Sequence, residues 1–281
     1  MKKQRILIDA VEKLLALRKM TRWQKQTHPK CPPVCWFGDV NCDQDKVVTL
    51  GANPSRWEYF KQIRGVGFKR ILLEPNQRRL YTLEKNETLE NIIVDSGIRA
   101  RIISRYNQYF ETGKAYRWFG LDSNTPYNAE GFLRGFGASY YASQCRSAEF
   151  RAIHIDLFPF FTVKDFKEIR SSIEDDIKQN DWAQNQISAL LKLIKPKHIL
   201  IFGRTNYRCL RDFFQEKKFA SNIPEMTNKH MTGELFGIKL FGISTNMGNP
   251  KGFNSRSLAL FGERIRKRSR CANESFESRA Q

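Results

Sequence analysis

The chain has 281 residues, of which 41% are hydrophobic and 12% aromatic, which is enough to bury a core. No apolar run approaches the roughly 18 residues of a membrane span, and charges run through the N-terminal segment where a signal peptide would be apolar. We therefore expect a cytoplasmic protein with no membrane partner, and the formal net charge of +19 predicts attraction to a polyanion.

The positive charge is concentrated at the two ends of the chain. Residues 1–30 hold nine Lys and Arg and two acids, and residues 264–281 hold six and two, so the ends carry more than half of the excess. Counterion release makes nucleic acid the leading partner for such a chain and an anionic membrane surface the weaker one. Basic ends that only aid solubility are the remaining interpretation. We expect a monomer that binds DNA and, in a bacterial cell, associates with the nucleoid.

The first 45 residues predict a basic helix and a linker. Residues 4–19 place Leu7, Leu14 and other apolar side chains on one helical face and basic side chains on the other. The polar stretch at 23–33 ends in two prolines, which is typical of a linker. We therefore assign residues 1–45 to a segment in front of the main domain.

Three of the six cysteines lie close together in this segment. They are Cys31, Cys35 and Cys42, with His28 just ahead, and their spacing matches no standard zinc signature. In an intracellular chain we expect reduced thiols rather than disulfides. The prediction is no metal and no other cofactor, with a structural metal as the less favoured alternative.

Four short apolar runs predict the strands of the main domain. The runs are KVVTLG, AIHIDLF, HILIFG and IKLFGIS, at residues 46–51, 152–158, 198–203 and 238–244. Helical patterns separate them, and continuous apolar strands between helices are typical of a parallel sheet covered on both faces. The sequence predicts an α/β fold with three layers, α/β/α, around a central four-stranded parallel sheet. This domain would span residues 46–266, before a basic disordered tail at 267–281.

A polar loop follows the first predicted strand, at the edge where ligands bind in an open parallel sheet. Its sequence is Gly51-Ala52-Asn53-Pro54-Ser55. Glycine lets the backbone approach a ligand, and Asn-Pro makes a turn that projects the amide above the sheet. A plain turn is the alternative interpretation.

A second polar loop follows the fourth predicted strand. It covers residues 244–256, STNMGNPKGFNSR, and leads into a helix that begins near Ser255. The free N–H groups of a helix N-terminus bind a phosphate, and an exposed apolar side chain such as Phe253 can enter a base stack. In the alternative interpretation Phe253 belongs to the core.

Together these loops resemble motifs of the uracil-DNA glycosylase superfamily. The first resembles the water-positioning motif in the Asn-Pro form of the mismatch-specific and single-strand-selective branches, and the second resembles the minor-groove intercalation loop. The segment IDLFP at 155–159 lies where the family keeps its pyrimidine-reading residue. The resemblance covers residues 46–60, 152–160 and 244–266, and it implies the uracil-DNA glycosylase fold.

The resemblance implies roles in catalysis and base binding. Asn53 would hold the water that attacks the anomeric carbon, and Asn249 would stand near O2 of the departing base. Phe60, favoured over Trp57 and Phe119, would stack on the base.

It also implies roles in DNA binding. Phe253 would fill the gap left by the flipped nucleotide, while Lys251, Ser255 and Arg256 would contact phosphates.

Three positions depart from the uracil-specific branch. Asn53 replaces an Asp, and since an amide cannot act as a general base, catalysis must rest more on stabilising the sugar cation and the leaving base. Ser55 replaces a Tyr that blocks C5 of the pyrimidine, so the pocket should admit a C5 substituent. Asp156 replaces an Asn that pairs with uracil. Its carboxyl accepts from an exocyclic amine and, in the neutral form that burial favours, donates to N3 of cytosine. An Asp156 that only caps a loop is the alternative.

The sequence therefore predicts an enzyme, a DNA glycosylase that flips a modified pyrimidine and hydrolyses its N-glycosidic bond to leave an abasic site. A cytosine reader with room at C5 favours a 5-substituted cytosine, such as the glucosylated 5-hydroxymethylcytosine of phage DNA that an anti-phage branch of the superfamily removes. Uracil or a damaged pyrimidine is the alternative substrate. A non-catalytic DNA-binding module and an enzyme acting on free nucleosides are alternatives of other classes.

Overall fold

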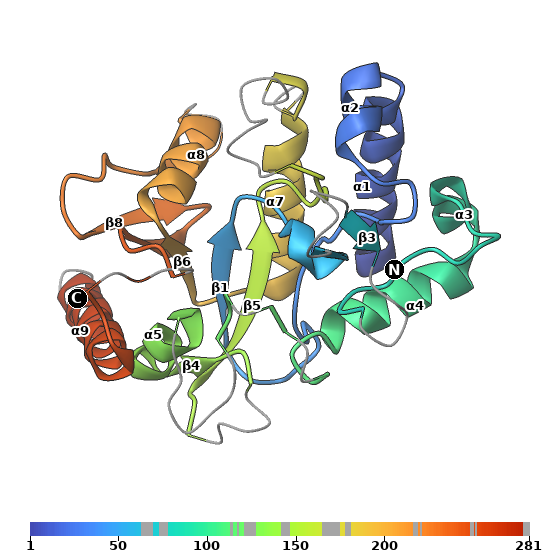
Figure 1. Ribbon diagram of the computed structural model, residues 1–281. Coiled ribbons are helices and arrows are strands. Elements are labelled where there is room, and N and C mark those ends of the chain that lie inside the picture. The colour runs from blue at the N-terminus through green and yellow to red at the C-terminus, as the bar shows by residue number, and fades with distance from the viewer. Residues whose placement is uncertain are drawn as a thin grey trace.

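The computed structural model shows an α/β fold (Figure 1). It describes residues 1–62, 70–72, 78–112, 115–116, 118–120, 128–141, 147–164, 175–177, 181–215, 219, 221–247, 250 and 252–277. The strands are β1 (Lys46–Gly51), β2 (Phe60–Gln62), β3 (Arg70–Leu72), β4 (Ala138–Ser139), β5 (Phe150–Asp156), β6 (His198–Phe202), β7 (Ser221–Asn222), β8 (His230–Leu235) and β9 (Ile238–Ile243). The helices are α1 (Lys2–Arg18), α2 (Thr21–Gln26), α3 (Leu89–Val94), α4 (Ser96–Asn107), α5 (Asn128–Phe136), α7 (Trp182–Ile194), α8 (Arg204–Phe214) and α9 (Ser255–Glu277).

The central sheet is mixed and seven-stranded, in the order β4-β5-β1-β6-β9-β8-β7. Strands β4, β5, β1, β6 and β9 run parallel, while β8 is antiparallel to β9 and β7 to β8. The α/β class is confirmed, and the four predicted strands are present as the parallel neighbours β5, β1, β6 and β9. The sheet has seven strands, which is more than the four that the sequence predicts. Strands β4 and β7 have only two residues each, which is too short for a recognisable apolar run. Strand β8 contains Gly233 and partly exposed side chains, so it does not form an apolar run either.

Helices cover both faces of the sheet, as the buried strands require. All seven residues of β5 are buried, and so are all of β1 after Lys46. On one face the ring of Phe136 in α5 lies 6.0 Å from that of Phe241 in β9. On the other face Tyr207 of α8 lies against the next residue of β9, Gly242. Since neighbouring residues of a strand face opposite sides, the sheet is enclosed between helical layers.

The N-terminal segment packs on the rest of the molecule. The apolar face predicted for residues 4–19 is buried in α1, including Leu7 and Leu14. Within the stretch expected as a linker, Trp23 is buried and its Nε1 donates to Asp176 at 2.9 Å. Further along, Phe37 forms a backbone bridge with His154 of β5. This segment therefore contributes to the core beside β5.

The last helix, α9, lies side by side with α5 (Figure 1). A Cβ added to Gly262 would come within 2.1 Å of the backbone oxygen of Phe132, so only glycine permits this approach. The helix continues to Glu277, past residue 267 where the sequence predicts a disordered tail. No glycine or proline follows Gly262 to stop it. No helix among the described residues is long and apolar enough to cross a membrane.

Candidate active site

A pocket of about 400 Å³ opens at the carboxyl end of β1. Strand β1 lies between β5 and β6, so the chain leaves it toward one side of the sheet and later returns on the other. Such a switch in strand order leaves a crevice outside the carboxyl ends of the strands, which is the usual ligand site of open α/β sheets. The pocket is lined by Phe37, Gly51, Ala52, Asn53, Pro54, Ser55, Glu58, Tyr116, Trp118, Phe119, His154, Asp156, Asn206 and Asn246.

The loop after β1 presents Asn53 and Ser55 to this pocket. Asn53 Nδ2 donates to Thr162 Oγ1 at 3.0 Å, and that hydroxyl donates onward to the carbonyl oxygen of Lys164. This contact fixes which end of the amide is its donor. Asn53 Oδ1 is then the end that remains to accept from a water in the pocket. Ser55 Oγ accepts from the N–H of Trp57, which leaves a small side chain at the wall.

Strand β5 ends in Asp156, two residues before the end that the sequence predicts, and the carboxyl is buried. Asp156 Oδ2 has no hydrogen-bond partner among the described residues, while Oδ1 lies 3.3 Å from His154 Nε2. His154 Nδ1 is in turn 2.9 Å from Thr49 Oγ1, which orients the imidazole. A Cβ on Gly51 would lie 2.3 Å from Asp156 Oδ1, so glycine is required beside the carboxyl. Asp156 therefore has one buried oxygen whose hydrogen-bonding capacity no described protein group satisfies.

A second buried carboxyl, Glu58, lies in the same pocket. It ends the short 3-10 helix η1 (Arg56–Glu58), and the hydroxyl of Tyr109 lies 2.7 Å and 2.8 Å from its two oxygens. Burial raises the pKa of Glu58 to about 7, and the nearby Asp156 also raises it, while Tyr109 and Arg79 oppose the shift. Glu58 therefore changes protonation state near neutral pH, as a general acid or base must.

Aromatic rings form the rest of the wall. Trp118 and Phe119 lie 5.2 Å and 5.0 Å from the ring of His154, and both line the pocket. Phe60 does not line it: its ring is stacked on Phe161 at 5.1 Å and 15° and is almost fully buried. Strand β2 turns Phe60 toward this neighbour, so Phe119 rather than Phe60 is the predicted ring that the structure brings to the site.

Part of the second predicted loop lies outside the described residues. Asn249 and Lys251 belong to that part. Phe253 is half-buried, with its ring stacked on Phe261 at 5.8 Å and 22°, and it does not line the pocket. Asn246, at the start of the loop, does.

The start of α9 is capped by the protein itself. Ser255 is its first residue and Arg256 is exposed, as phosphate contacts would need. Asn254 Oδ1 accepts from the N–H of Ser257 at 2.8 Å, and the Ser257 hydroxyl accepts from the Asn254 N–H. This cap already satisfies one N–H group that a phosphate would otherwise bind.

The cysteines of the N-terminal segment lie apart from this pocket. Cys31 and Cys35 are buried, and burial raises the pKa of both thiols. Among the residues that the structure describes, no three His, Cys, Asp or Glu side chains are placed to hold a metal ion.

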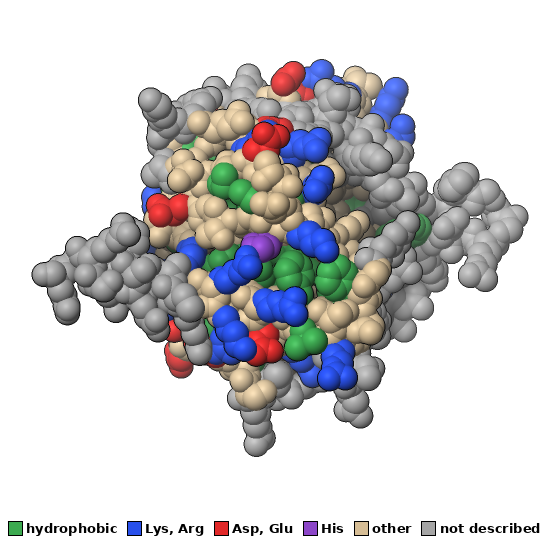
Figure 2. All heavy atoms as spheres, turned by 90° about the vertical axis from the view of Figure 1, so that its left-hand side faces the viewer, with side chains coloured by type: hydrophobic (Ala, Val, Ile, Leu, Met, Phe, Trp, Pro, Cys, Tyr) green, Lys and Arg blue, Asp and Glu red, His purple; other side chains and the backbone are tan. Residues whose placement is uncertain are grey.

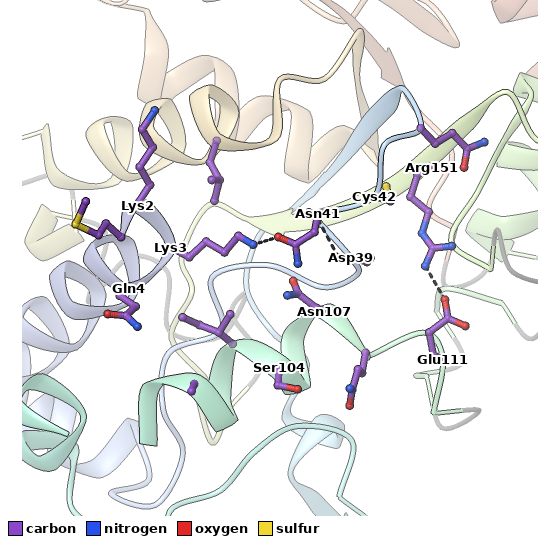
Figure 3. A pocket seen from close by; sticks show the side chains of 16 residues that line it. Lys2, Lys3, Gln4, Asp39, Asn41, Cys42, Ser104, Asn107, Glu111 and Arg151 are labelled. Carbon is purple, nitrogen blue, oxygen red and sulfur yellow. Dashed lines mark hydrogen bonds and ion pairs between the residues drawn. The ribbon is translucent and has the colours of Figure 1, made fainter. Parts of the chain in front are cut away.

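A larger pocket of about 1040 Å³ lies near the amino end of β5, where Arg151 lines it (Figure 3). Two of its cationic side chains already bind protein groups. Lys3 donates to Asn41 Oδ1, and Arg151 pairs with Glu111 at 2.6 Å. None of the predicted site residues that the structure describes lines this pocket.

No protein-family model and no curated protein matches the chain.

Proposed function

We propose that the protein is a DNA glycosylase that hydrolyses the N-glycosidic bond of a flipped pyrimidine nucleotide. One observation carries the proposal: a single pocket at the carboxyl edge of β1 and β5 holds the Asn53 amide, the Asp156 carboxyl and the Glu58 carboxyl. A uracil-DNA glycosylase-like arrangement of β5, β1, β6 and β9 is part of the same proposal. The net charge of +19 suits a monomeric protein that acts on DNA.

Asn53 and Glu58 divide the handling of water between them. Asn53 Oδ1 accepts from the water and positions it, but an amide cannot take its proton. Glu58, five residues later on the same loop, supplies a carboxylate. As water adds to the anomeric carbon, its proton passes to Glu58, and the electrons of the broken C–N bond leave with the base.

Asp156 reads the base. Its Oδ2, which has no partner among the described residues, accepts from the exocyclic amine of a cytosine, a group that uracil lacks. The ring of Phe119 offers a face for stacking, and Ser55 leaves room for a group on C5. These features favour a 5-substituted cytosine, such as the glucosylated 5-hydroxymethylcytosine of phage DNA, and hence a role in antiviral defence.

The direct test uses otherwise identical oligonucleotides that carry uracil, cytosine, 5-hydroxymethylcytosine or its glucosylated form. Each is incubated with the protein, and abasic sites are scored by alkaline cleavage. We expect cleavage only where a substituted cytosine stood. Preference for uracil would assign the protein to uracil repair. Salt-dependent binding without any abasic product would indicate a non-catalytic module, and activity confined to free nucleosides would contradict the DNA substrate.

A further inference from the structure

A second, separate groove lies between α9 and the start of β8. It has a volume of about 340 Å³ and is lined by Lys229, His230, Phe253, Ser257, Leu260, Phe261, Arg264, Ile265 and Arg268. Figure 2 shows this side of the molecule, where hydrophobic side chains lie in the middle of a group of Lys and Arg side chains. The groove lies outside the pocket that holds Asn53 and Asp156.

The floor of the groove is apolar and open to water. The rings of Phe253 and Phe261 are stacked, Phe253 is only half-buried, and Leu260 is 46% exposed. Large apolar side chains with this exposure are few among the described residues. A contiguous exposed apolar surface rimmed by polar groups is typical of a binding site.

The rim of the groove is cationic. Lys229, Arg264 and Arg268 line it, and none of its lining residues is acidic. Burial and the neighbouring Arg268 lower the pKa of His230, which favours the neutral form of the imidazole. The one acid of this stretch of α9, Glu263, pairs with Lys267 at 2.8 Å, and neither of these residues lines the groove. The occupant should therefore combine negative charge with a flat apolar face.

The groove is also within reach of the catalytic pocket. Phe253 follows the pocket residue Asn246 by seven residues. The Cα atoms of Asn246 and Phe253 are therefore at most about 25 Å apart. A chain of ring contacts joins the same places through the core, from Phe261 to Phe132, Phe202 and Trp118. One DNA strand can therefore contact both.

We propose that this groove binds a single-stranded stretch of the DNA that flanks the flipped nucleotide, with an unstacked base on Phe253 and phosphates on Arg264 and Arg268. A duplex hides the faces of its bases, and an acidic peptide has the charge without a flat ring. A single strand offers both, and aromatic platforms with basic rims are the usual way in which proteins bind it. The choice of DNA as the partner rests on the function proposed above.

The test measures binding rather than excision. Fluorescence anisotropy is recorded with a short labelled oligothymidylate and with a strand of the same length made of abasic residues, at several salt concentrations. Phe253→Leu keeps an apolar side chain but removes the ring face. It should weaken oligothymidylate binding by about fivefold or more and leave binding of the abasic strand unchanged. The double variant Arg264→Gln/Arg268→Gln should weaken both probes and reduce the slope of log K against log salt by ~1.4.

Lys267→Gln is the matched control, since it removes a positive charge from the same helix outside the groove. It should change the salt slope by less than ~0.7, which is the share expected for each arginine of the double variant. Equal loss of both probes in Phe253→Leu would rule out stacking. The proposal would be overturned if the groove variants bound oligothymidylate like wild type, or if polyglutamate competed more strongly than oligothymidylate for the groove. Neither result would contradict the proposed glycosylase activity. A protein that makes no abasic sites yet shows the expected pattern would instead contradict the glycosylase alone.

Discussion

The two pockets at opposite ends of β5 differ in how their polar groups are used. The larger one has room for a bigger ligand, but Lys3 and Arg151 are already bound to protein acceptors there. In the smaller one, Asp156 Oδ2 has no partner among the described residues, and burial raises the pKa of Glu58 to about 7. Because unpaired and shifted carboxyls cost folding free energy, they indicate function more strongly than cavity volume does.

The position of the pockets supports the same distinction. At the carboxyl end, Asn53 and Ser55 lie on the loop that follows β1, whose conformation the sheet does not dictate, while Asp156 is the last residue of β5. Near the amino end, Arg151 belongs to β5 itself and is held by Glu111 of the segment after α4. We therefore expect substitutions in the small pocket to change catalysis, and substitutions in the large pocket to leave it unchanged.

The largest effect should come from Asn53→Ala. The amide positions water in the transition state and contributes little to ground-state binding, so base release should fall by roughly three orders of magnitude while DNA affinity stays within a few fold. The measurement is single-turnover formation of abasic sites, beside a binding titration on the same oligonucleotide. Asn41→Ala in the large pocket is the matched control and should retain activity. If both variants lose activity equally, the distinction between the pockets is wrong.

Asp156→Asn should change the base that is removed. The amide keeps the size of the side chain but replaces an acceptor by a donor, so release of a cytosine-type base should fall by roughly two orders of magnitude. The same amide can pair with O4 and N3–H of uracil, so some uracil excision should appear. The check is a comparison of initial rates on uracil and substituted-cytosine oligonucleotides, with Asp39→Asn in the large pocket as the control. An unchanged preference would show that Asp156 does not read the base.

The sequence could predict the residues that lie on the parallel strands. Continuous apolar runs predict the strands β1, β5, β6 and β9. Neighbouring parallel strands end at the same edge of a sheet, so Asn53 and Asp156 are expected to lie near each other. His154 could have been found as well, because it is two residues before Asp156 and alternation puts both on one face.

The sequence could not show the contacts that depend on distant segments. Glu58 reads as an ordinary exposed acid, whereas in the fold it is buried and accepts from Tyr109, about fifty residues later in a stretch without recognisable motifs. Phe60 fails for the same reason, since its partner Phe161 comes from beyond β5. Such side-chain pairings are set by tertiary packing, which neither periodicity nor spacing records.

Glu58→Gln should lower excision by about two orders of magnitude, because the general base is lost. In wild type Glu58 must be ionised to act as the general base, so kcat/KM should rise with pH through about 7 and then level off. The variant should lose this rise. The experiment is a pH profile of kcat/KM for both proteins. A wild-type rate that instead falls above pH 7 would make Glu58 the acid, and a profile retained in the variant would assign the titration to another group.

The smallest effect concerns stability, and it tests Glu58 without any substrate. Burial raises the pKa of Glu58 from 4.5 in the unfolded chain to about 7 in the fold, so the folded protein holds a proton that the unfolded chain releases. The stabilisation is complete below about pH 4.5 and is lost as the pH rises to about 7, by about 3 kcal/mol for this one group. Chemical denaturation of wild type and Glu58→Gln across pH 4 to 8 measures the difference between the two free energies of unfolding. As the pH rises, the free energy of unfolding of the variant should increase relative to that of wild type, because glutamine has no proton to lose. A constant difference between wild type and Glu58→Gln would mean that Glu58 ionises at its ordinary pH, and the small pocket would then lack the strained carboxyl that distinguishes it from the large one.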